Sequence, residues 1–524
     1  MSDPAGTRSW PAVLMPSRAA QRIVLALVLA LPLLWQLAGT PLFDVDEGAF
    51  SEATREMLSS GDWGHTTLNG APRFDKPIGV YWLQAIAVRL FGLNEFALRL
   101  PSALSCWVMA LALAAFAAAR WGPRAGALAG AMTVSSIGFL VIGRSATADS
   151  LLNMLLVLAA LDAWRYIESG ESAPLQRAYA WVGLGLLVKG PVAVLIPGAA
   201  VFVWAVTSGR WRMLVAALAE WRGWAWLLVL ALPWYVYALH RDGMAFVDGF
   251  LLHHNFERFT GTIGGHRGSL LYYVAVMPLL LMPWTPLVAV VVARARSLWA
   301  QPLARYLLGW SGFVLLFFSF SSTKLPHYAL YGCAPLVLLM ARALEQARPW
   351  VARRVAASVL AWTCIVAAVP ALVAHFAPTV RDPLYHALLA GAPSASLLAP
   401  ALVLLLVAVL AWGEATAQRW WRLPAAAGAV ALLVCSWSLP WFGETLQGPV
   451  RAAAAAAAAH PGNIVQSGVH LPSFSVYAER IVPKSDAPLP GDIVLGRADR
   501  PPAGAARPHL FEQRGVVLFG PSAP

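Results

Sequence analysis

The side chains of this sequence that could carry chemistry lie in short stretches between long apolar segments. An acidic cluster (Asp44, Asp46, Glu47) follows the first apolar segment, and Asp149 stands at the start of the fourth. Ionisable groups at a membrane boundary are costly and usually functional. Helix capping would account for one acid of the cluster and is the alternative for Asp149. The remaining carboxylates could accept a proton or orient a nearby cation.

Lysine is rare, and its positions are informative. Only four of the 38 basic side chains are lysines, namely Lys76, Lys189, Lys324 and Lys484. Lys76 follows Asp75, whereas Lys189 and Lys324 stand at helix ends next to proline. Snorkelling to the interface would explain any one of them alone. The topology below places all four on one side of the membrane. Lys76, Lys189 and Lys324 together indicate a site for anions there, because the compact charge of lysine suits phosphate.

A loop at residues 241–269 adds histidines and one arginine. His253, His254 and His266 lie close together there, with Arg258 between them. A single surface histidine is usually solvated, but this group favours phosphate or metal binding. There is no His-Glu-x-x-His motif, no paired cysteine motif and no phosphate loop, so neither a zinc enzyme nor a nucleotide-binding protein is indicated.

The composition determines which elements must position these residues. Of 524 residues, 59% are hydrophobic and 12% are charged, and mean hydropathy is +0.63. These values exclude disorder, coiled coils and secreted disulfide scaffolds. A spanning helix needs about 20 apolar residues, which predicts about 13 spans. They start near residues 22, 101, 124, 148, 177, 191, 224, 270, 304, 327, 355, 396 and 424.

The loop arginines predict the orientation of these spans. Arginine-rich loops alternate with loops poor in basic residues, and the net charge of +12 is spread thinly, which argues against a nucleic-acid partner. The positive-inside rule puts the N-terminus in the cytoplasm, and an odd number of spans puts the C-terminus in the periplasm. We therefore predict an all-α polytopic membrane protein.

Two outer regions interrupt the membrane domain, which we assign to residues 1–444. The first is the loop 41–100, where helical spacing predicts amphipathic helices at 49–58 and 78–91 that lie on the membrane surface. The second is residues 445–524. An alanine run at 452–459 and three strand-like pieces predict a small α/β domain there.

Several motifs together resemble a known family. The first loop contains Asp46-Glu47, then Gly61-Asp62-Trp63 and Phe74-Asp75-Lys76-Pro77; later come Lys189-Gly190-Pro191, Pro283-Trp284-Thr285 and Lys324-Leu325-Pro326-His327-Tyr328. This order resembles the lipid A aminoarabinose transferases, which are polyprenyl-phosphate-sugar glycosyltransferases of the GT-C class related to protein O-mannosyltransferases. The resemblance covers about residues 20–345.

The resemblance implies roles for individual residues. Asp46 is the acid on which activity depends, Lys76 contacts the donor phosphate, and Asp149 holds Lys76. By the same resemblance, Arg258 and Tyr328 bind phosphate, and Asp75 and His253 can hold a metal ion. Glu47, Lys189, His254 and Lys324 are further substrate candidates from their residue types and positions. The family often has Glu-Lys-Pro where this chain has Asp75-Lys76-Pro77, and the shorter carboxylate weakens the case for a divalent metal ion.

The implied function is transfer of a sugar from undecaprenyl phosphate to a lipid A phosphate, with inversion, at the periplasmic face of the bacterial inner membrane. No nucleotide is required, and a monomer is expected. The sugar could be aminoarabinose, glucosamine or galacturonic acid, and a hydroxyl acceptor on a glycan or a protein is the alternative. A lipid or sugar transporter is a further alternative, but its ion-coupling acids would be expected within the spans.

Overall fold

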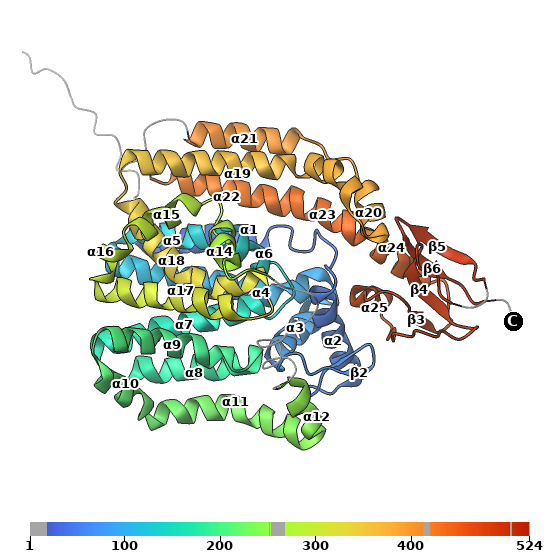
Figure 1. Cartoon of the computed structure of the whole chain (residues 1–524), viewed down its shortest axis with the longest axis horizontal. Coiled ribbons are helices and arrows are strands. Elements are labelled where there is room, and N and C mark those ends of the chain that lie inside the picture. The colour runs from blue at the N-terminus through green and yellow to red at the C-terminus, as the bar shows by residue number, and fades with distance from the viewer. Residues whose placement is uncertain (1–17, 251, 253–267, 412–419, 504–505, 523–524) are drawn as a thin grey trace, which may run out of the picture.

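The computed structural model describes residues 18–250, 252, 268–411, 420–503 and 506–522. Long helices run side by side in a bundle, and a small domain lies at one end of it (Figure 1). The first helices of the bundle are α1 (Arg18–Leu34), α4 (Glu95–Trp121), α5 (Pro123–Ser135), α6 (Ile137–Gly143), α7 (Asp149–Ser169), α8 (Ser172–Lys189), α9 (Val192–Thr207), α10 (Trp211–Leu218), α11 (Trp221–Asp242) and α12 (Met244–Phe246). The later ones are α14 (Tyr272–Leu280), α15 (Thr285–Ala293), α16 (Ala295–Trp299), α17 (Pro302–Phe320), η2 (Pro326–Gly332), α18 (Cys333–Glu345), α19 (Pro349–Phe376), η3 (Ala377–Thr379), α20 (Pro383–Ala390), α21 (Leu398–Ala411), α22 (Arg422–Leu433), η4 (Val434–Ser438) and α23 (Leu439–Leu446).

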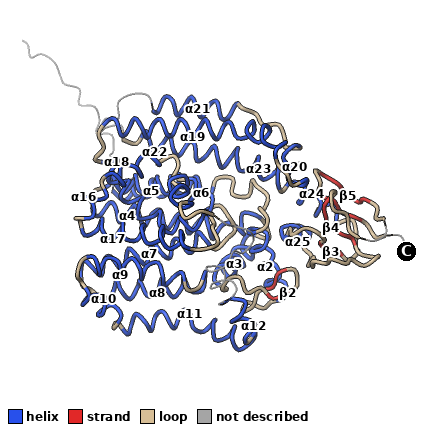
Figure 2. The backbone as a smooth tube through the Cα atoms, viewed as in Figure 1, coloured by secondary structure: helices blue, strands red, loops and turns tan. Residues whose placement is uncertain are grey.

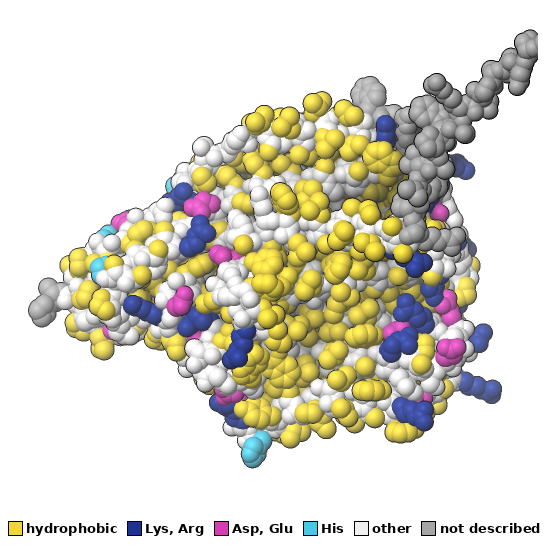
Figure 3. Space-filling model, turned by 180° about the vertical axis from the view of Figure 1, so that it is seen from behind, with side chains coloured by type: hydrophobic (Ala, Val, Ile, Leu, Met, Phe, Trp, Pro, Cys, Tyr) yellow, Lys and Arg dark blue, Asp and Glu magenta, His cyan; other side chains and the backbone are white. Residues whose placement is uncertain are grey.

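The bundle has the surface of a multi-pass membrane protein. Within the described residues, seven helices are long and apolar enough to cross a membrane, or eight if α5 and α6, bent by 65°, form one span. Hydrophobic side chains cover the middle of the bundle, and charged side chains gather towards its two ends (Figure 3). Helices lie near all 13 predicted positions, but some, including α14 and α15 with 9 residues each, are too short to span alone.

Small residues allow the central helices to approach closely. A Cβ added at Gly126 of α5 would lie 2.6 Å from the carbonyl oxygen of Ala114 in α4. Such contacts are typical of membrane helix pairs, which associate through packing rather than through exclusion of water. α4 and α7 pack against each other within the bundle, and α7 begins with Asp149.

Two short helices cap the end of the bundle where the acidic cluster lies. α2 (Asp46–Ser60) and α3 (Gly79–Phe91) are joined through a hairpin of β1 (Thr67–Leu68) and β2 (Ala71–Pro72). Both helices lie where the sequence predicts them. The prediction that α2 exposes a polar face of Glu52, Arg55 and Glu56 was wrong, because both glutamates are buried and Arg55 is half-buried. The C-terminal domain and the hairpin cover it.

The C-terminal domain has an α/β fold. It contains α24 (Gly448–Ala457), β3 (Ile464–Gln466), α25 (Pro472–Ala478), β4 (Ile493–Arg497), β5 (His509–Gln513) and β6 (Val516–Phe519). The strand order is β3-β4-β6-β5, with β3 and β4 parallel and the other pairs antiparallel. The alanine run and three predicted strands correspond to α24, β3, β4 and β6. The sequence analysis missed β5, a half-exposed edge strand without a clear apolar alternation (Figure 2).

Candidate functional site

A groove of about 510 Å³ opens at the end of the bundle that α2 caps. Its titratable lining consists of Asp44, Asp46, Glu47, Asp149 and His327. The remaining lining is mainly apolar and comes from α6, α14, η2 and α23, with side chains that include Ile137, Val141, Ile142, Leu280, Leu330, Leu439 and Phe442. The fold thus brings Asp46 and Asp149, about 100 residues apart in sequence, to one cavity as predicted. A carboxylate-lined groove with an apolar wall suits a ligand that is polar at one end and lipidic along its length.

Asp149 forms the centre of a hydrogen-bonded cluster at this groove. Its Oδ1 lies 2.6 Å from Lys189 Nζ, accepts a hydrogen bond of 2.9 Å from the Tyr331 hydroxyl, and lies 3.7 Å from His327 Nε2. Lys189 Nζ also donates to the Tyr331 hydroxyl at 2.9 Å. The family resemblance predicts Lys76 as the partner of Asp149. Among the described residues, the lysine that pairs with Asp149 is Lys189.

Helix ends explain why this pair forms. Asp149 is in the first turn of α7, where a negative charge is stabilised by the helix dipole. Lys189 is the last residue of α8, where a positive charge is stabilised in the same way. α7 and α8 pack along each other, so the two favourable ends meet. The pair is therefore pre-formed by the bundle, before any ligand binds.

Aromatic rings from η2 line the other side of the Lys189 ammonium. Lys189 Nζ lies 5.3 Å from the ring centre of Tyr328 and 5.7 Å from that of Tyr331. Tyr328 is 8% exposed and packs on Phe318, with centroids 4.9 Å apart. The ring faces add cation–π stabilisation to the ion pair. Tyr328, predicted to bind phosphate, thus lies beside the charged cluster.

Asp46 and Lys76 lie on the first loop among further charges. Asp46 is exposed at the groove, and Lys76 Nζ donates to the Asp75 carbonyl at 2.8 Å. The Arg73 guanidinium pairs with the Asp75 carboxylate at 3.0 Å and donates to the Tyr81 hydroxyl at 3.1 Å. Burial lowers the pKa of Arg73, but Tyr81, Asp75 and Asp46 together raise it above its usual value. Arg73, which the sequence analysis did not select, is therefore a fixed cation within the field of Asp46.

Glu47 has a structural role in place of the substrate contact that we predicted. Its carboxylate accepts two hydrogen bonds from Arg99, at 2.9 and 2.8 Å, and two from the backbone N–H groups of Phe43 and Ala146, at 2.9 and 2.6 Å. Arg99 donates its other hydrogen bonds to three backbone carbonyls, those of Leu37, Thr40 and Pro41. Protein groups thus satisfy both partners, and the pair locks the start of α2 to the bundle.

Lys324, another predicted substrate contact, caps a helix. It is 6% exposed, and its Nζ donates to the carbonyls of Phe318 at 3.0 Å and Ser319 at 2.5 Å, at the end of α17. Burial lowers its pKa below the usual value for lysine. These contacts assign the ammonium to the orphan carbonyls of the last helical turn rather than to a ligand.

Three predicted residues, His253, His254 and Arg258, lie outside the described residues. Within the described residues, no group of three or more histidine, cysteine, aspartate or glutamate side chains has the arrangement of a metal site. Asp75, the other predicted metal ligand, forms an ion pair with Arg73. The described residues therefore do not by themselves form a metal site.

The sequence analysis did not select His327 and Tyr331, but the signals for both were present. His327 lies within the Lys324–Tyr328 motif, and Tyr331 follows Tyr328 by three residues in η2. Neighbours at that spacing share a face of a helix. Once Tyr328 was selected, Tyr331 could have been found from its spacing.

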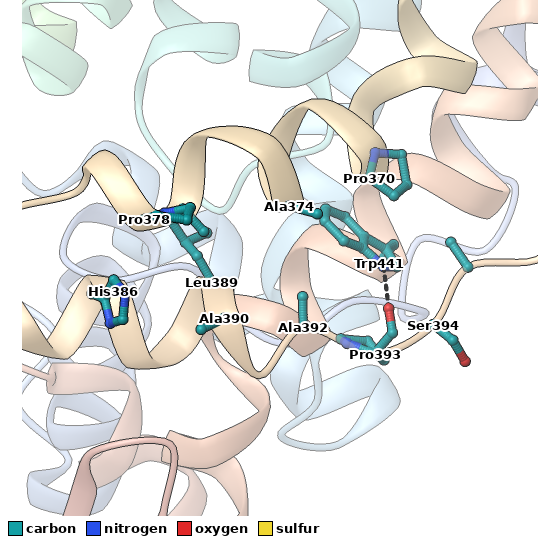
Figure 4. A pocket seen from close by; sticks show the side chains of 12 residues that line it. Pro370, Ala374, Pro378, His386, Leu389, Ala390, Ala392, Pro393, Ser394 and Trp441 are labelled. Carbon is teal, nitrogen blue, oxygen red and sulfur yellow. Dashed lines mark hydrogen bonds between the residues drawn. The ribbon is translucent and has the colours of Figure 1, made fainter.

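A second cavity, of about 450 Å³, lies behind α23. Figure 4 shows its lining around Trp441, whose indole N–H donates to the Pro393 carbonyl at 2.8 Å. His386 is its one titratable lining residue among those described. Leu439 and Phe442 of the same helix face the first groove, so α23 separates the two cavities. The second cavity contains none of the predicted site residues.

Comparison with known proteins supports a particular family. A sequence model described as dolichyl-phosphate-mannose-protein mannosyltransferase matches residues 75–237. The undecaprenyl phosphate-α-4-amino-4-deoxy-L-arabinose arabinosyl transferase of Edwardsiella ictaluri (strain 93-146) is 30% identical over 332 residues, which are 60% of this chain and 58% of that protein. The protein of the same name from Pseudomonas aeruginosa (strain UCBPP-PA14) is 29% identical over 413 residues, 77% of this chain and 71% of that protein. The alignment with the Edwardsiella protein thus spans less than two thirds of that relative.

The fold comparison extends over almost the whole chain. The crystal structure of ArnT from Cupriavidus metallidurans bound to undecaprenyl phosphate matches with a TM-score of 0.77 and 20% identity, covering 96% of this chain and 97% of that one. At this identity the match establishes the fold. Together, the motifs, the sequence relatives and the fold confirm the predicted resemblance to the aminoarabinose transferases.

Proposed function

Because this chain is similar in sequence to the aminoarabinose transferases and has the GT-C fold of one of them, we propose that it is an integral inner-membrane glycosyltransferase. It transfers aminoarabinose, or a related amino or acidic sugar, from undecaprenyl phosphate to a lipid A phosphate. The observation that carries this proposal is the groove, where Asp46, Asp149 and His327 face an apolar wall. The polar end suits a phosphate-linked sugar, and the wall suits its polyprenyl chain.

The reaction is a displacement at the anomeric carbon of the sugar. An acceptor oxygen forms the new bond from the face opposite to the bond that breaks, which inverts the anomeric configuration. The electron pair of the broken bond leaves with the polyprenyl phosphate. Charge grows on that leaving group, so fixed cations stabilise the transition state. Lys76 supplies one such cation, with Arg258 as the second candidate. Lys189, held by Asp149, is an additional positive charge beside the groove.

A lipid A phosphate is already an anion and needs no strong general base. In that case Asp46, exposed at the groove, orients the donor rather than accepting a proton. A hydroxyl acceptor is the second candidate. One observation favours it, because the matched family model describes transferases that act on proteins. With a hydroxyl acceptor, Asp46 would accept the proton, and the rate would rise with pH through the titration of a carboxylate.

The proposed topology places this chemistry in the periplasm. About 13 spans, counted from apolar stretches of about 20 residues, put the N-terminus in the cytoplasm and the C-terminal domain on the periplasmic side. The charges of the site gather at one end of the bundle, which supports surface chemistry over transport through the membrane. A divalent metal at Asp75 and His253 stays a prediction, as does the monomeric state, and we derive no step through a metal.

A transfer assay tests the proposal. Purified protein is incubated with undecaprenyl-phosphate-linked aminoarabinose and lipid A, and the product is identified by mass spectrometry and NMR. A sugar joined to a lipid A phosphate supports the proposal. A sugar joined to a hydroxyl supports the second candidate, and no transfer from any polyprenyl phosphate sugar contradicts both.

The variant Lys76→Ala tests the site in the same assay. We expect it to abolish transfer with little effect on folding, since Lys76 is half-buried on the first loop and donates to the Asp75 carbonyl there. Lys76→Arg should also be poor, because a planar fork does not replace a compact charge. Lys484→Ala, a change of the exposed lysine in the C-terminal domain, is the matched control and should keep activity. An active Lys76→Ala protein would contradict the donor-phosphate role.

A further inference from the structure

The C-terminal domain forms hydrogen bonds with the turn that carries Asp46. The Asp44 carboxylate accepts a hydrogen bond of 2.9 Å from the backbone N–H of Ser473 and a second from the Ser473 hydroxyl. The Gln447 amide, in the orientation that satisfies both of its polar atoms, donates to Asp44 at 3.2 Å and accepts from the Asp44 backbone N–H at 3.3 Å. Ser473 is fully buried and Gln447 is 7% exposed. Two segments from the end of the chain thus hold one side chain at its beginning.

α2 and α25 approach each other so closely that only glycine fits at position 48. A Cβ added at Gly48 in α2 would lie 2.1 Å from Asp44 Oδ1 and 2.5 Å from the Ser473 backbone nitrogen. Any side chain at this position would push α25 away from α2. The contact is therefore built into the packing of the two helices, and is not a chance meeting of surface groups.

The same turn is fixed on its other side by the bundle. Glu47 is locked to Arg99 and to the backbone of Ala146, as described above. Asp46 lies between the two fixed carboxylates and is itself exposed at the groove. Asp44 and Glu47 thus anchor both sides of a turn on which Asp46 is the exposed acid at the groove.

We propose that Asp44 and Ser473 are positioning residues, through which the C-terminal domain holds Asp46 in the geometry that transfer requires. This inference rests on the proposed function, and it gives the C-terminal domain a role in catalysis. A displacement of about 1 Å at a reacting group can cost about 10²-fold in rate. Loss of the hydrogen bonds between Asp44 and Ser473 should therefore lower kcat while the binding groove stays in place.

The role of Asp44 does not require a negative charge. Burial raises the pKa of Asp44 to about 7, hydrogen bonds from Ser473 lower it, and repulsion by Glu47 raises it. The asparagine of Asp44→Asn can still accept the bond from the Ser473 N–H, so a positioning role predicts that this variant keeps most activity. A role as proton acceptor predicts that it loses activity as fully as Asp44→Ala.

The decisive comparison is between two serines of α25. Ser473→Ala removes a hydroxyl from the acidic turn. Ser475→Ala removes an equally buried hydroxyl that lies 3.1 Å from Asn69 Oδ1 of the hairpin and does not contact the turn. We expect Ser473→Ala to lower kcat about tenfold or more with little change in the donor KM, and Ser475→Ala to leave kcat within about twofold. Thermal stability of both variants is measured alongside.

Hydrogen–deuterium exchange supplies a readout that does not depend on activity. Exchange of the peptide that contains residues 43–47 should rise in Ser473→Ala and stay unchanged in Ser475→Ala. Equal kcat values for the two variants, or unchanged exchange at the turn in Ser473→Ala, would overturn the inference. If the wild-type protein transfers no sugar, the proposed function fails, and the exchange data still decide whether Ser473 holds the turn.

Discussion

Two buried carboxylate–cation pairs lie at the same end of the bundle, and their surroundings differ. All described hydrogen bonds of Arg99 are donated to Glu47 and to three backbone carbonyls. Glu47 accepts four hydrogen bonds from protein groups. In the other pair, Asp149 and Lys189 share Tyr331, and Asp149 lies at the groove together with His327. Both carboxylates line the groove, but protein groups saturate Glu47 and Arg99, which we call the closed pair. In the open pair, Asp149 and Lys189, the carboxylate accepts fewer hydrogen bonds from the described protein groups.

This difference separates stability from chemistry. A buried pair that protein groups saturate has no capacity left for a substrate, and removing one partner leaves an uncompensated charge. A pair at a cavity can still exchange a neighbour for a ligand, and its field acts on whatever binds there. Glu47 and Asp149 are both acidic residues near a membrane boundary in the sequence, but their hydrogen-bond partners give Glu47 a structural role and Asp149 a role at the site. Four substitutions test this assignment, beginning with the one of largest expected effect.

Arg99→Met should prevent stable folding. It leaves the Glu47 carboxylate buried without a cation and removes donors from three backbone carbonyls, a loss of about 3–5 kcal/mol in the free energy of unfolding. The measurements are the yield of folded protein and the thermal melting temperature in detergent. Arg144→Met is the control, because Arg144 also binds backbone carbonyls, those of Pro32, Leu33 and Gln36, but has no carboxylate partner there. Equal losses in the two variants would contradict the assignment.

Asp149→Asn should instead lower the rate of transfer by about 10²–10³, with a much smaller effect on melting, because one preorganised electrostatic contact of the site is lost. The amide keeps the shape of the carboxylate but no longer balances Lys189. Steady-state kinetics of transfer measures the effect. The control is Asp162→Asn. Asp162 is another aspartate of α7, and it pairs with Arg165 and Arg177 away from the groove, so its substitution should leave kcat unchanged. A normal kcat for Asp149→Asn would remove the open pair from the chemistry.

The sequence indicates part of the groove lining, namely the acidic turn and Asp149, but it does not indicate the apolar wall from α6, α14 and α23. The apolar segments, the two loop helices and three C-terminal strands could be read from periodicity, because each depends on local pattern. Asp46 and Asp149, both predicted as site residues, line one groove, and the described lysine partner of Asp149 is Lys189 in place of the predicted Lys76.

The partners could not be predicted because they depend on distances between helices. Whether Lys76 or Lys189 reaches Asp149 depends on how α7 and α8 pack, and no local pattern in the sequence shows that packing. Glu47 was taken for a ligand contact, since nothing near it in sequence reveals Arg99, 52 residues away. The burial of α2 depends on α25, at the far end of the chain. In each case a long-range contact decided the role.

Lys324→Met tests a cation whose described hydrogen bonds go to protein groups, as those of Arg99 do. Its ammonium caps the carbonyls of Phe318 and Ser319, and hydrogen bonds to charged groups contribute about 1.5–3 kcal/mol. We expect a lower melting temperature with kcat and the donor KM within about threefold of wild type. Lys189→Met should give the opposite result, a small change in melting and a large loss of kcat. A raised donor KM in Lys324→Met would restore its predicted role as a substrate contact.

Tyr331→Phe should have the smallest effect on kcat, and it tests the hydrogen bonds between Tyr331 and the Asp149–Lys189 pair. The Tyr331 hydroxyl bridges Asp149 and Lys189, so its loss removes one donor from the carboxylate and one acceptor from the ammonium. The ring stays in place beside Lys189, and the direct ion pair of 2.6 Å remains. A single hydrogen bond contributes about 1 kcal/mol, so kcat should fall about fivefold.

Tyr306→Phe provides the matched control for that change. The Tyr306 hydroxyl is equally buried and donates to the Ala160 carbonyl at 2.9 Å, deeper in the bundle. Both variants should lose similar stability, whereas only Tyr331→Phe should lose rate. In an Asp149→Asn background the Tyr331→Phe change should cost less than it does alone, because the hydroxyl acts through the Asp149–Lys189 pair. If the losses of kcat were fully additive in the double variant, Tyr331 would act independently of the Asp149–Lys189 pair, by direct contact with the ligand.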